Sequence, residues 1–532
     1  MSPPPPPGSR IHTPQGFKPS VNRVVRLDAD QTAIVECYDK VIVANACAGS
    51  GKTTMAQFFA DARQDKKILY LCFGKANQVI ARARFGKHVD CRTGHSLAYE
   101  AVGHRFDKQN VYFLPAQDFA RQLKIVDARK AAIVLDVLNQ FCSSQDAVIG
   151  EQHLLEPAIK WGLNENALGE LLPLTKLAWT KICVQGSGIG ILPDFYLKMW
   201  ALSRPRLERY NNIILDEAQD TNPVLAQIVE DQTHTHRLLV GDKHQSIYHF
   251  RGAMNAMATF EAMGATVMHM PRTWRFGPDI ADKANKLLSL FKGEKTAIIG
   301  AGPSAPRRAE DKRAVLSRSN AGLIAEAAAV YGRNVHWVGG IKNYKVDVLV
   351  DAYHLSIDQR SLIRDSNLRG CQSWSKYKAD ADRMRDGQAK LLIKLVDQYR
   401  KDIPNMVRSF HTNALETEAG AKLVLSTMHK AKGLEYDHVT IGEDFRSLDK
   451  AMSSLLALPL ESLDSDLEQE INGLYVGFTR ARHQLDMNTE SKDFFKNYPR
   501  HVSAYQEALA RANLAQDHDA LDPMQCHQAN TA

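Results

Sequence analysis

Short apolar runs alternate with stretches of helical periodicity along most of this chain. Residues 41–44 and 68–71 are continuous apolar runs, each followed by a helical pattern, and residues 213–215 and 238–240 repeat the arrangement later. Runs of this length are typical of strands covered on both faces, as in parallel sheets. The alternation therefore predicts an α/β fold with parallel sheets.

Two mainly helical stretches interrupt this alternation, from about residue 97 to 202 and from 347 to 418. A second α/β set begins near Val267, continues at residues 314–316 and resumes at 423–425. A chain of 532 residues is too long for one ordinary core and should divide into about two to four domains. We therefore predict two α/β lobes, each with a mainly helical insertion: lobe 1A at 21–98 and 203–266, insertion 1B at 99–202, lobe 2A at 267–346 and 419–515, and insertion 2B at 347–418.

The two ends of the chain lack the patterns of folded elements. Residues 1–20 are proline-rich and residues 516–532 are polar without apolar periodicity, so both are predicted to be disordered tails. No apolar run approaches the roughly 18 residues that span a membrane, and no charged-then-apolar leader opens the chain. We therefore expect no membrane partner, and a location in the cytoplasm and nucleoid, or in the nucleus of a eukaryote.

Charge and cysteine content narrow the function classes only slightly. The net charge of +7 permits a nucleic-acid partner without requiring one. None of the eight cysteines pair at metal-ligand spacing, and several lie within apolar runs. Reduced, buried thiols therefore fit better than disulfides or a zinc or iron–sulfur site.

A glycine-rich loop between the run at 41–44 and the following helical pattern indicates a phosphate site. Small residues in such a loop let backbone N–H groups surround a triphosphate at a helix N-terminus. Lys52 is expected to reach the β- and γ-phosphates, and the Thr53 hydroxyl to bind Mg²⁺. The cofactors implied are ATP and Mg²⁺, held by Ala48, Gly49, Ser50, Gly51, Lys52, Thr53 and Thr54. The strand before and the helix after argue against a chance glycine-rich turn.

An acidic pair ends the later apolar run at 213–215. Asp216 is predicted to hold the Mg²⁺ through water, and Glu217 to orient or deprotonate the attacking water. A lone Asp-Glu after a strand is more often a solvated helix start. In a chain that already has a complete phosphate loop, the pair becomes a strong signal.

With these residues in place, the chain resembles the UvrD/Rep branch of superfamily 1 helicases. Motifs follow the family order from Leu27 to Arg482, and the Asp-Glu-Ala-Gln-Asp form at residues 216–220 is characteristic of that branch. Further matches lie at residues 240–253, 273–276, 425–436 and 474–482. The resemblance implies two RecA-like P-loop lobes that enclose one ATP.

The resemblance also implies roles around the nucleotide. The Gln31 amide would read the adenine edge, Trp274 would stack on the base, and Glu435 would face the ribose. Gln245 would sense the γ-phosphate, and Arg275 and Arg480 would stabilise its developing charge. The implied catalytic set is Lys52, Asp216, Glu217, Gln245, Arg275 and Arg480. Gln31 could instead be a surface helix residue, and Arg275 a surface ion pair of little energetic value.

Contacts to DNA are implied on the same grounds. Phe250 occupies the position at which relatives stack an aromatic ring on a base, a contact worth on the order of 1–3 kcal/mol and tolerant of sequence. Tyr248 is a weaker candidate, because at alternating spacing one of these two rings can belong to the core. The full set of candidates is Phe73, His95, Tyr248, Phe250, Arg251, Thr427 and His429.

Residues 69–75, 93–99, 196–200 and 338–342 narrow the resemblance to the helicase portion of the F-box DNA helicases. That likeness implies 3′→5′ unwinding and removal of recombinase filaments from single strands. The chain starts too close to Leu27 to hold an F-box, so no ubiquitin-ligase partner is expected.

Three functions follow. The first is an ATP-dependent 3′→5′ DNA helicase or single-stranded DNA translocase of repair or recombination, acting on single strands and their junctions with duplex. The second is a motor that strips protein filaments from single strands with little unwinding. The third, disfavoured by the complete ATP motifs, is a DNA-binding scaffold that does not hydrolyse ATP.

Overall fold

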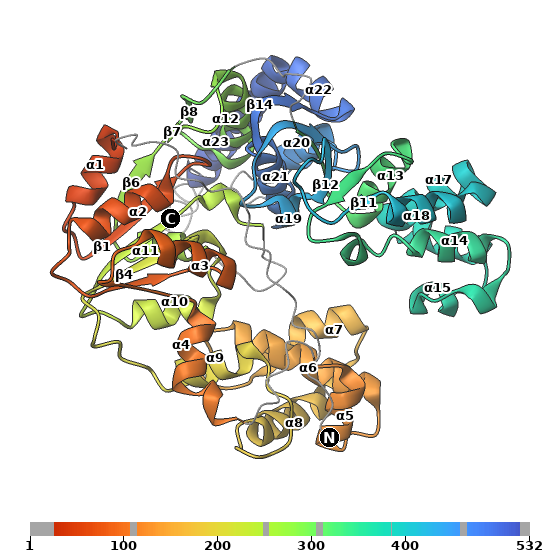
Figure 1. Cartoon of the computed structure of the whole chain (residues 1–532), viewed down its shortest axis with the longest axis horizontal. Helices are drawn as coiled ribbons and strands as arrows, with labels where there is room; N and C mark the ends of the chain where they lie inside the picture. Colours follow the sequence, from red (N-terminus) through yellow and green to blue (C-terminus); the bar gives the residue numbers. More distant parts are fainter. Residues whose placement is uncertain are drawn as a thin grey trace, which may run out of the picture.

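The computed structural model describes residues 26–106, 114–247, 255–304, 312–384, 386–457 and 465–521. It contains two six-stranded parallel sheets, each in its own lobe (Figure 1). The predicted α/β class, with two parallel sheets and helical insertions, is confirmed.

The first lobe is built on a sheet with the strand order β3-β2-β4-β5-β1-β6. The strands predicted at residues 41, 68, 213 and 238 are all present. Their bounds, with the two remaining strands, are β1 (Val41–Ala46), β2 (Ile68–Leu71), β3 (Val89–Arg92), β4 (Asn212–Asp216), β5 (His236–Gly241) and β6 (Thr266–Met270). Because β1, β4 and β5 are neighbours and parallel, the segments that follow them meet at one edge of the sheet.

Helices cover both faces of this sheet. They are α1 (Ala29–Glu36), α2 (Lys52–Asp61), α3 (Lys75–Arg84), α10 (Pro223–Glu230) and α11 (Ala256–Ala262). Two short 3₁₀ turns, η3 (Ala218–Asp220) and η4 (Lys243–Gln245), follow β4 and β5 directly.

A separate helical body is inserted between β3 and β4 and lies below the first lobe in Figure 1. Its helices are α4 (Gly94–Ala101), α5 (Ala116–Leu123), α6 (Ala128–Ser143), α7 (Leu155–Trp161), α8 (Glu165–Ile182) and α9 (Pro193–Leu202), with 3₁₀ turns η1 (Gly103–Arg105) and η2 (Glu151–Leu154). Phe119, Phe141 and Phe195 are fully buried between these helices, which gives the insertion an apolar core of its own.

The second lobe has the strand order β11-β10-β12-β9-β13-β14. Its strands are β9 (Arg313–Ser317), β10 (Val335–Trp337), β11 (Ala414–Leu415), β12 (Leu423–Thr427), β13 (Tyr436–Ile441) and β14 (Ala481–Asp486). Its helices are α12 (Pro278–Lys292), α13 (Asn320–Ala329), α19 (Met428–Ala431), α20 (Leu448–Ala457), α21 (Ser465–Phe478), α22 (Thr489–Lys496) and α23 (Tyr498–Leu521). Strands β7 (Arg272–Thr273) and β8 (Ile299–Gly300) form a small separate pair.

A second helical group extends from this lobe between β10 and β11, on the right of Figure 1. It comprises α14 (Val348–Ser356), α15 (Ser366–Gly370), α16 (Trp374–Arg383), α17 (Gly387–Tyr399) and α18 (Ile403–Thr412), with 3₁₀ turns η6 (Ile341–Tyr344), η7 (Arg360–Leu362) and η8 (Arg400–Asp402).

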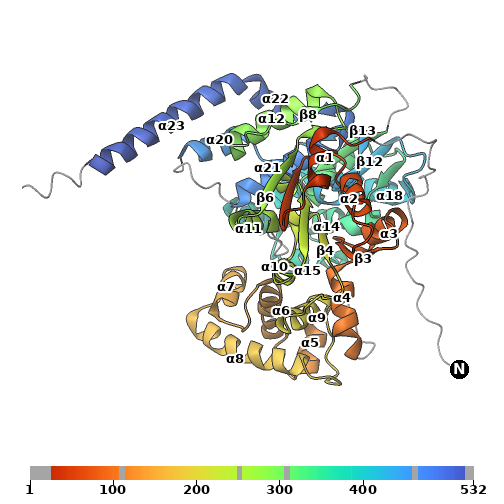
Figure 2. The same ribbon diagram turned by 90° about the vertical axis from the view of Figure 1, so that its left-hand side faces the viewer.

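Three predicted boundaries differ from the structure. Strand β6, predicted to open the second lobe, pairs with β1 in the first, because an apolar run does not specify which sheet edge it joins. Strand β11 falls inside the stretch assigned to insertion 2B and pairs with β10, since a strand this short leaves no periodic signal. Helix α23 continues to Leu521, past the predicted coil from residue 516, and extends away from the body in Figure 2. Good helix formers propagate a helix without an apolar stripe.

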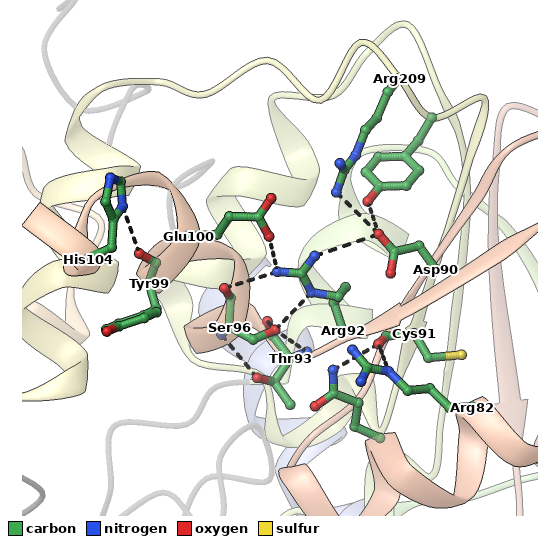
Figure 3. Close-up of polar contacts among 12 residues, drawn as sticks. Arg82, Asp90, Cys91, Arg92, Thr93, Ser96, Tyr99, Glu100, His104 and Arg209 are labelled. Carbon is green, nitrogen blue, oxygen red and sulfur yellow. Dashed lines mark hydrogen bonds and ion pairs between the residues drawn. The ribbon is translucent and has the colours of Figure 1, made fainter.

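Arg92 lies where the chain leaves the first lobe for its helical insertion and close to where the chain returns. Its guanidinium donates to the Ser96 hydroxyl (3.2 Å) and carbonyl (3.1 Å) and pairs with Glu100 on α4 (Figure 3). Arg92 also faces Asp90, which accepts hydrogen bonds from Arg209 at 3.2 Å and Tyr210 at 2.6 Å on the returning connection. This polar network fixes the base of the insertion against the sheet.

Within the described ranges, no helix is both long and apolar enough to cross a bilayer. The cysteines of the same ranges form no disulfide; Cys72, Cys91 and Cys142 are buried, whereas Cys183 is exposed.

We expect Arg92→Met to lower the free energy of unfolding by about 1–3 kcal/mol, because it leaves two carboxylates without their shared partner. Urea unfolding of both proteins measures this. Arg383→Met is the matched control, since Arg383 is 66% exposed in its pair with Asp380 and should change stability by less than about 0.5 kcal/mol. Equal losses in the two variants would contradict a structural role for the Arg92 network.

Candidate nucleotide and nucleic-acid site

The loop between β1 and α2 has the backbone of a phosphate cradle. Gly49 and Gly51 adopt φ values of 75° and 82°, which residues other than glycine rarely adopt. Lys52 and Thr53 open helix α2, so the loop amides and the helix N-terminus face the same space. The buried Ser50 hydroxyl has no hydrogen-bond partner among the residues that the structure describes. An unsatisfied polar atom in this loop fits a site for phosphate oxygens.

Gln31 holds the phosphate loop. Its Nε2 donates to the Ser50 carbonyl (2.9 Å), and its Oε1 accepts from the Asp28 backbone N–H (3.0 Å) in the capping box of α1. Gln31 is therefore not a surface residue. Its predicted contact with adenine stays a prediction, since in this structure both ends of the amide have protein partners.

The predicted acidic pair lies at the end of β4, opposite the phosphate loop. Asp216 accepts a hydrogen bond from the Tyr70 hydroxyl at 2.6 Å, and burial and the neighbouring Glu217 raise its pKa to about 6. Burial also opposes the charge of Glu217, but Lys52 and Lys432 outweigh it and lower the pKa of Glu217 to about 2. Glu217 therefore keeps its negative charge next to the lysine of the cradle.

The segment after β5 links the two lobes. Gln245 Nε2 donates to Asp242 (2.7 Å), and Gln245 Oε1 accepts from Arg480 Nη2 (3.1 Å) of the second lobe. Tyr475, on α21 of the second lobe, donates its hydroxyl hydrogen to Asp242 (2.9 Å) and accepts from the backbone N–H of Ala48 (3.4 Å). Sequence reasoning did not single out Asp242 or Tyr475.

Arg480 is fully buried at this junction. Besides Gln245, it donates to the carbonyls of Val476 (3.0 Å) and Leu434 (3.3 Å). Burial and the nearby Arg275 lower the pKa of Arg480 to about 9. Two guanidinium groups held this close in a buried site are suited to bind a multiply charged anion.

Arg275 reaches the same site from the segment that connects the lobes. It donates to Glu435 (3.0 Å) and to the Thr479 carbonyl (2.9 Å). Its backbone passes so close to the phosphate loop that a Cβ on Gly49 would lie 2.5 Å from the Arg275 Cβ. The two arginines and the cradle are thus assembled in one place.

Trp274 and Glu435 flank this site. The Trp274 backbone N–H donates to the Gly49 carbonyl (3.0 Å). The residue is 52% exposed beside the loop, as a stacking surface for a base requires. The Glu435 carboxylate faces Arg275 in this structure, so its predicted contact with ribose stays a prediction.

A polar cleft of about 680 Å³ opens in the second lobe at the carboxyl ends of β9, β10 and β12. Thr427 and His429, both predicted DNA contacts, lie in its wall. Sequence reasoning missed the rest of its lining: Arg318, Ser319, Asn320, Val338, Gly339, Gln388, Lys430 and Lys432. Arg318, Ser319 and Asn320 follow the predicted strand at residues 314–316 directly, and that position is the signal that could have identified them.

Two predicted DNA contacts lie elsewhere, one after a strand of the first lobe and one on the first helix of its insertion. Phe73 follows β2 and is 46% exposed, and His95, on α4, forms a 2.8 Å contact with Asp194 on α9 of the insertion. The remaining three candidates, Tyr248, Phe250 and Arg251, lie outside the described residues.

A phosphate cradle and an acidic pair in one α/β lobe, with two arginines from the other side of the junction, define a two-lobed P-loop nucleotide site of RecA-like type. Comparison with known proteins agrees. Residues 196–262 match the UvrD/REP helicase N-terminal domain, and residues 358–492 match the UvrD-like helicase C-terminal domain.

Two relatives align with most of the chain. F-box DNA helicase 1 of Gallus gallus is 30% identical over 521 residues, or 91% of this chain and 51% of the relative. F-box DNA helicase protein 1 of Schizosaccharomyces pombe is 28% identical over 516 residues, 87% of this chain and 57% of the relative. A shorter match, 34% identity over 87 residues, covers 15% of this chain and 7% of the RecBCD enzyme subunit RecB of Escherichia coli.

The chain carries matches to both the N-terminal and the C-terminal domain of UvrD/REP-type helicases and is homologous over most of its length to F-box DNA helicase 1. It spans about half the length of the two F-box relatives. UvrD-like helicase domains imply ATP binding.

Gly49→Ala should reduce the rate of ATP hydrolysis by about a hundredfold. The added methyl group would push the phosphate loop away from Arg275 by up to about 1 Å, and a misplacement of that size is enough to cause such a loss. Steady-state ATPase assays measure the effect. Gly169→Ala, on α8, places its methyl group in open space and should leave turnover intact. Wild-type turnover in the Gly49 variant would show that this close approach is not needed.

Proposed function

We propose that this chain is an ATP-dependent 3′→5′ DNA helicase or single-stranded DNA translocase that acts in DNA repair or recombination. The observation that carries the proposal is the contact between Arg480 of the second lobe and Gln245 of the first, at 3.1 Å, within the same buried site as Glu217. A site completed only by both lobes can couple hydrolysis to their relative motion.

The phosphate loop supplies the binding half of the reaction. Lys52 and the loop amides would hold the β- and γ-phosphates, and the ring of Trp274 would cover the adenine. The Thr53 hydroxyl and the buried Asp216 carboxylate would hold Mg²⁺, a hard cation that prefers oxygen ligands. When bound, Mg²⁺ would neutralise phosphate charge.

Glu217 and the arginines supply the chemical half. Gln219 donates a 2.6 Å hydrogen bond to Glu217, which fixes the carboxylate that would orient the attacking water. Arg275 and Arg480 would stabilise the negative charge that develops on the transferred phosphoryl group. Arg480 also donates to Gln245 of the first lobe, so the position of Arg480 relative to the phosphate loop would change whenever the lobes separate.

The cleft of the second lobe would hold the DNA backbone. Its basic and hydroxyl side chains suit phosphates, which are the same in every sequence, so binding there would depend on salt and little on sequence. Helix α21 connects this cleft to the ATP site. Its buried Glu470 accepts a 2.6 Å hydrogen bond from Arg318 in the cleft wall, and its Asn472 donates to the Ser246 carbonyl (2.8 Å) of the first lobe.

Cycles of closing and opening would then move the strand. ATP binding favours the closed arrangement because both lobes contact the triphosphate, and hydrolysis removes that preference. The DNA repair or recombination role, and single strands and duplex junctions as substrates, rest on the similarity to F-box DNA helicases.

If the motor mainly strips recombinase filaments, displacement of the filaments will be efficient where duplex unwinding is weak.

Lys52→Ala should abolish ATP hydrolysis and, with it, unwinding of duplexes that carry a 3′ single-stranded overhang. ATPase assays with and without single-stranded DNA, together with unwinding of 3′- and 5′-tailed duplexes by the wild type, test activity and polarity. Turnover that survives in Lys52→Ala would remove the assignment of the phosphate loop. Preference for 5′ tails would reverse the proposed direction.

Arg480→Ala should slow hydrolysis by about a thousandfold while ATP binding changes much less, because the guanidinium acts mainly on the transition state. Single-turnover hydrolysis and equilibrium binding of a fluorescent ATP analogue separate the two effects. A thermal melt shows whether the variant is folded. Equal losses of binding and hydrolysis in a folded variant would contradict the catalytic role.

A further inference from the structure

Lys432 stands at the boundary between the polar cleft and the ATP site. It lies between α19 and β13 of the second lobe, and its ammonium donates to the Asp220 carboxylate and the Gln245 carbonyl of the first lobe. The side chains of Lys432 and Asp220 are only 9% and 1% exposed. This is therefore a buried ion pair across the two lobes.

The same lysine also lines the cleft, next to Thr427, His429 and Lys430. One ammonium group is thus within reach of two environments: the acidic wall of the ATP site and the proposed path of a DNA backbone. Phosphate oxygens are strong acceptors for an ammonium group.

Both lobe-1 partners of Lys432 connect to catalytic groups. The Gln219 amide donates to Asp220 (3.2 Å) as well as to Glu217 (2.6 Å). The side chain of Gln245 lies between Asp242 and Arg480. A shift of the Lys432 ammonium therefore alters the surroundings of the water-orienting carboxylate and of the γ-phosphate arginine together.

The ion pair is incompletely satisfied. Among the described residues, Asp220 Oδ1 is buried without a hydrogen-bond partner, and burial raises the pKa of Asp220 to about 6. A buried pair that lacks part of its hydrogen bonding is weakly held for its type. Such a pair can exchange one partner for a competing anion.

We propose that Lys432 is the positioning residue through which an occupied cleft activates the ATP site: its ammonium binds Asp220 and Gln245 when the cleft is empty, and is shared with a backbone phosphate when a single strand is bound. This inference rests on the proposed function, because it needs a strand in the cleft. Lys432 acts through Gln219 and Gln245 and touches neither the reacting phosphate nor the water.

Lys430 provides a matched control. It carries the same charge in the same cleft, but its ammonium lies 3.5 Å from the centre of the Tyr344 ring and 3.5 Å from the Asn343 carbonyl, both in the second lobe. Removing its charge should weaken strand binding without changing how the bound strand affects hydrolysis.

The first test measures the ratio of ATPase rates with saturating oligo(dT) and without it. Lys432→Met should lower this ratio by about tenfold, within the usual range of an allosteric coupling, whereas Lys430→Met should keep it within about threefold of wild type. Using saturating strand removes differences in affinity. An unchanged ratio in Lys432→Met, or an equal loss in both variants, would overturn the inference.

The second test uses the sign of the change in strand affinity. Asp220→Asn keeps the shape of the side chain but weakens its hold on Lys432, so oligo(dT) should bind about fivefold more tightly, while Lys432→Met should bind about fivefold more weakly. A merely structural ion pair predicts changes of the same sign, and that result would overturn the inference. If oligo(dT) fails to stimulate or bind even the wild type, the proposed function itself fails.

Discussion

The buried guanidinium of Arg480 is the constraint on which the rest of this structure depends. A fully buried cation is costly unless it is surrounded by acceptors, and Arg480 finds them in both lobes: the Val476 and Leu434 carbonyls in its own and the Gln245 side chain in the other. Within its own lobe Arg480 also donates to the Thr479 hydroxyl (3.1 Å), and closure of the lobes adds the Gln245 side chain to these acceptors. The same contact brings a cation next to the phosphate loop, so stability of the closed form and readiness for chemistry have a common origin.

Helix α21 connects the second-lobe cleft with the contacts between the two lobes. Its residues contact the cleft through Glu470, the loop after β5 through Asn472, and Asp242 through Tyr475. The helix can lie this deep because two of its positions are glycine: a Cβ on Gly473 would be 2.4 Å from the Met428 sulfur. One rigid element thus links the proposed DNA path to the nucleotide, which makes coordinated movement of the two sites physically direct.

Much of the fold could be predicted from local pattern. Strands β1, β2, β4 and β5 are buried on both faces, so each is a continuous apolar run that needs no knowledge of its neighbours. The phosphate loop is equally local, because the left-handed backbone at Gly49 and Gly51 restricts which residues can occupy it. The family resemblance added the arginines, and the structure assembles Arg275 and Arg480 beside the loop.

The features that could not be predicted are contacts between residues far apart in the sequence. The sequence by itself determined the two-lobed α/β class, the phosphate loop and the acidic pair, because local backbone geometry and burial dictate those residue types. Only the tertiary structure decided that β6 joins the first sheet, that Gln31 holds Ser50, and that Lys432 meets Asp220 across more than two hundred residues. A buried polar group takes its partner from whatever the fold brings within reach, so such pairs become visible only when the packing is known.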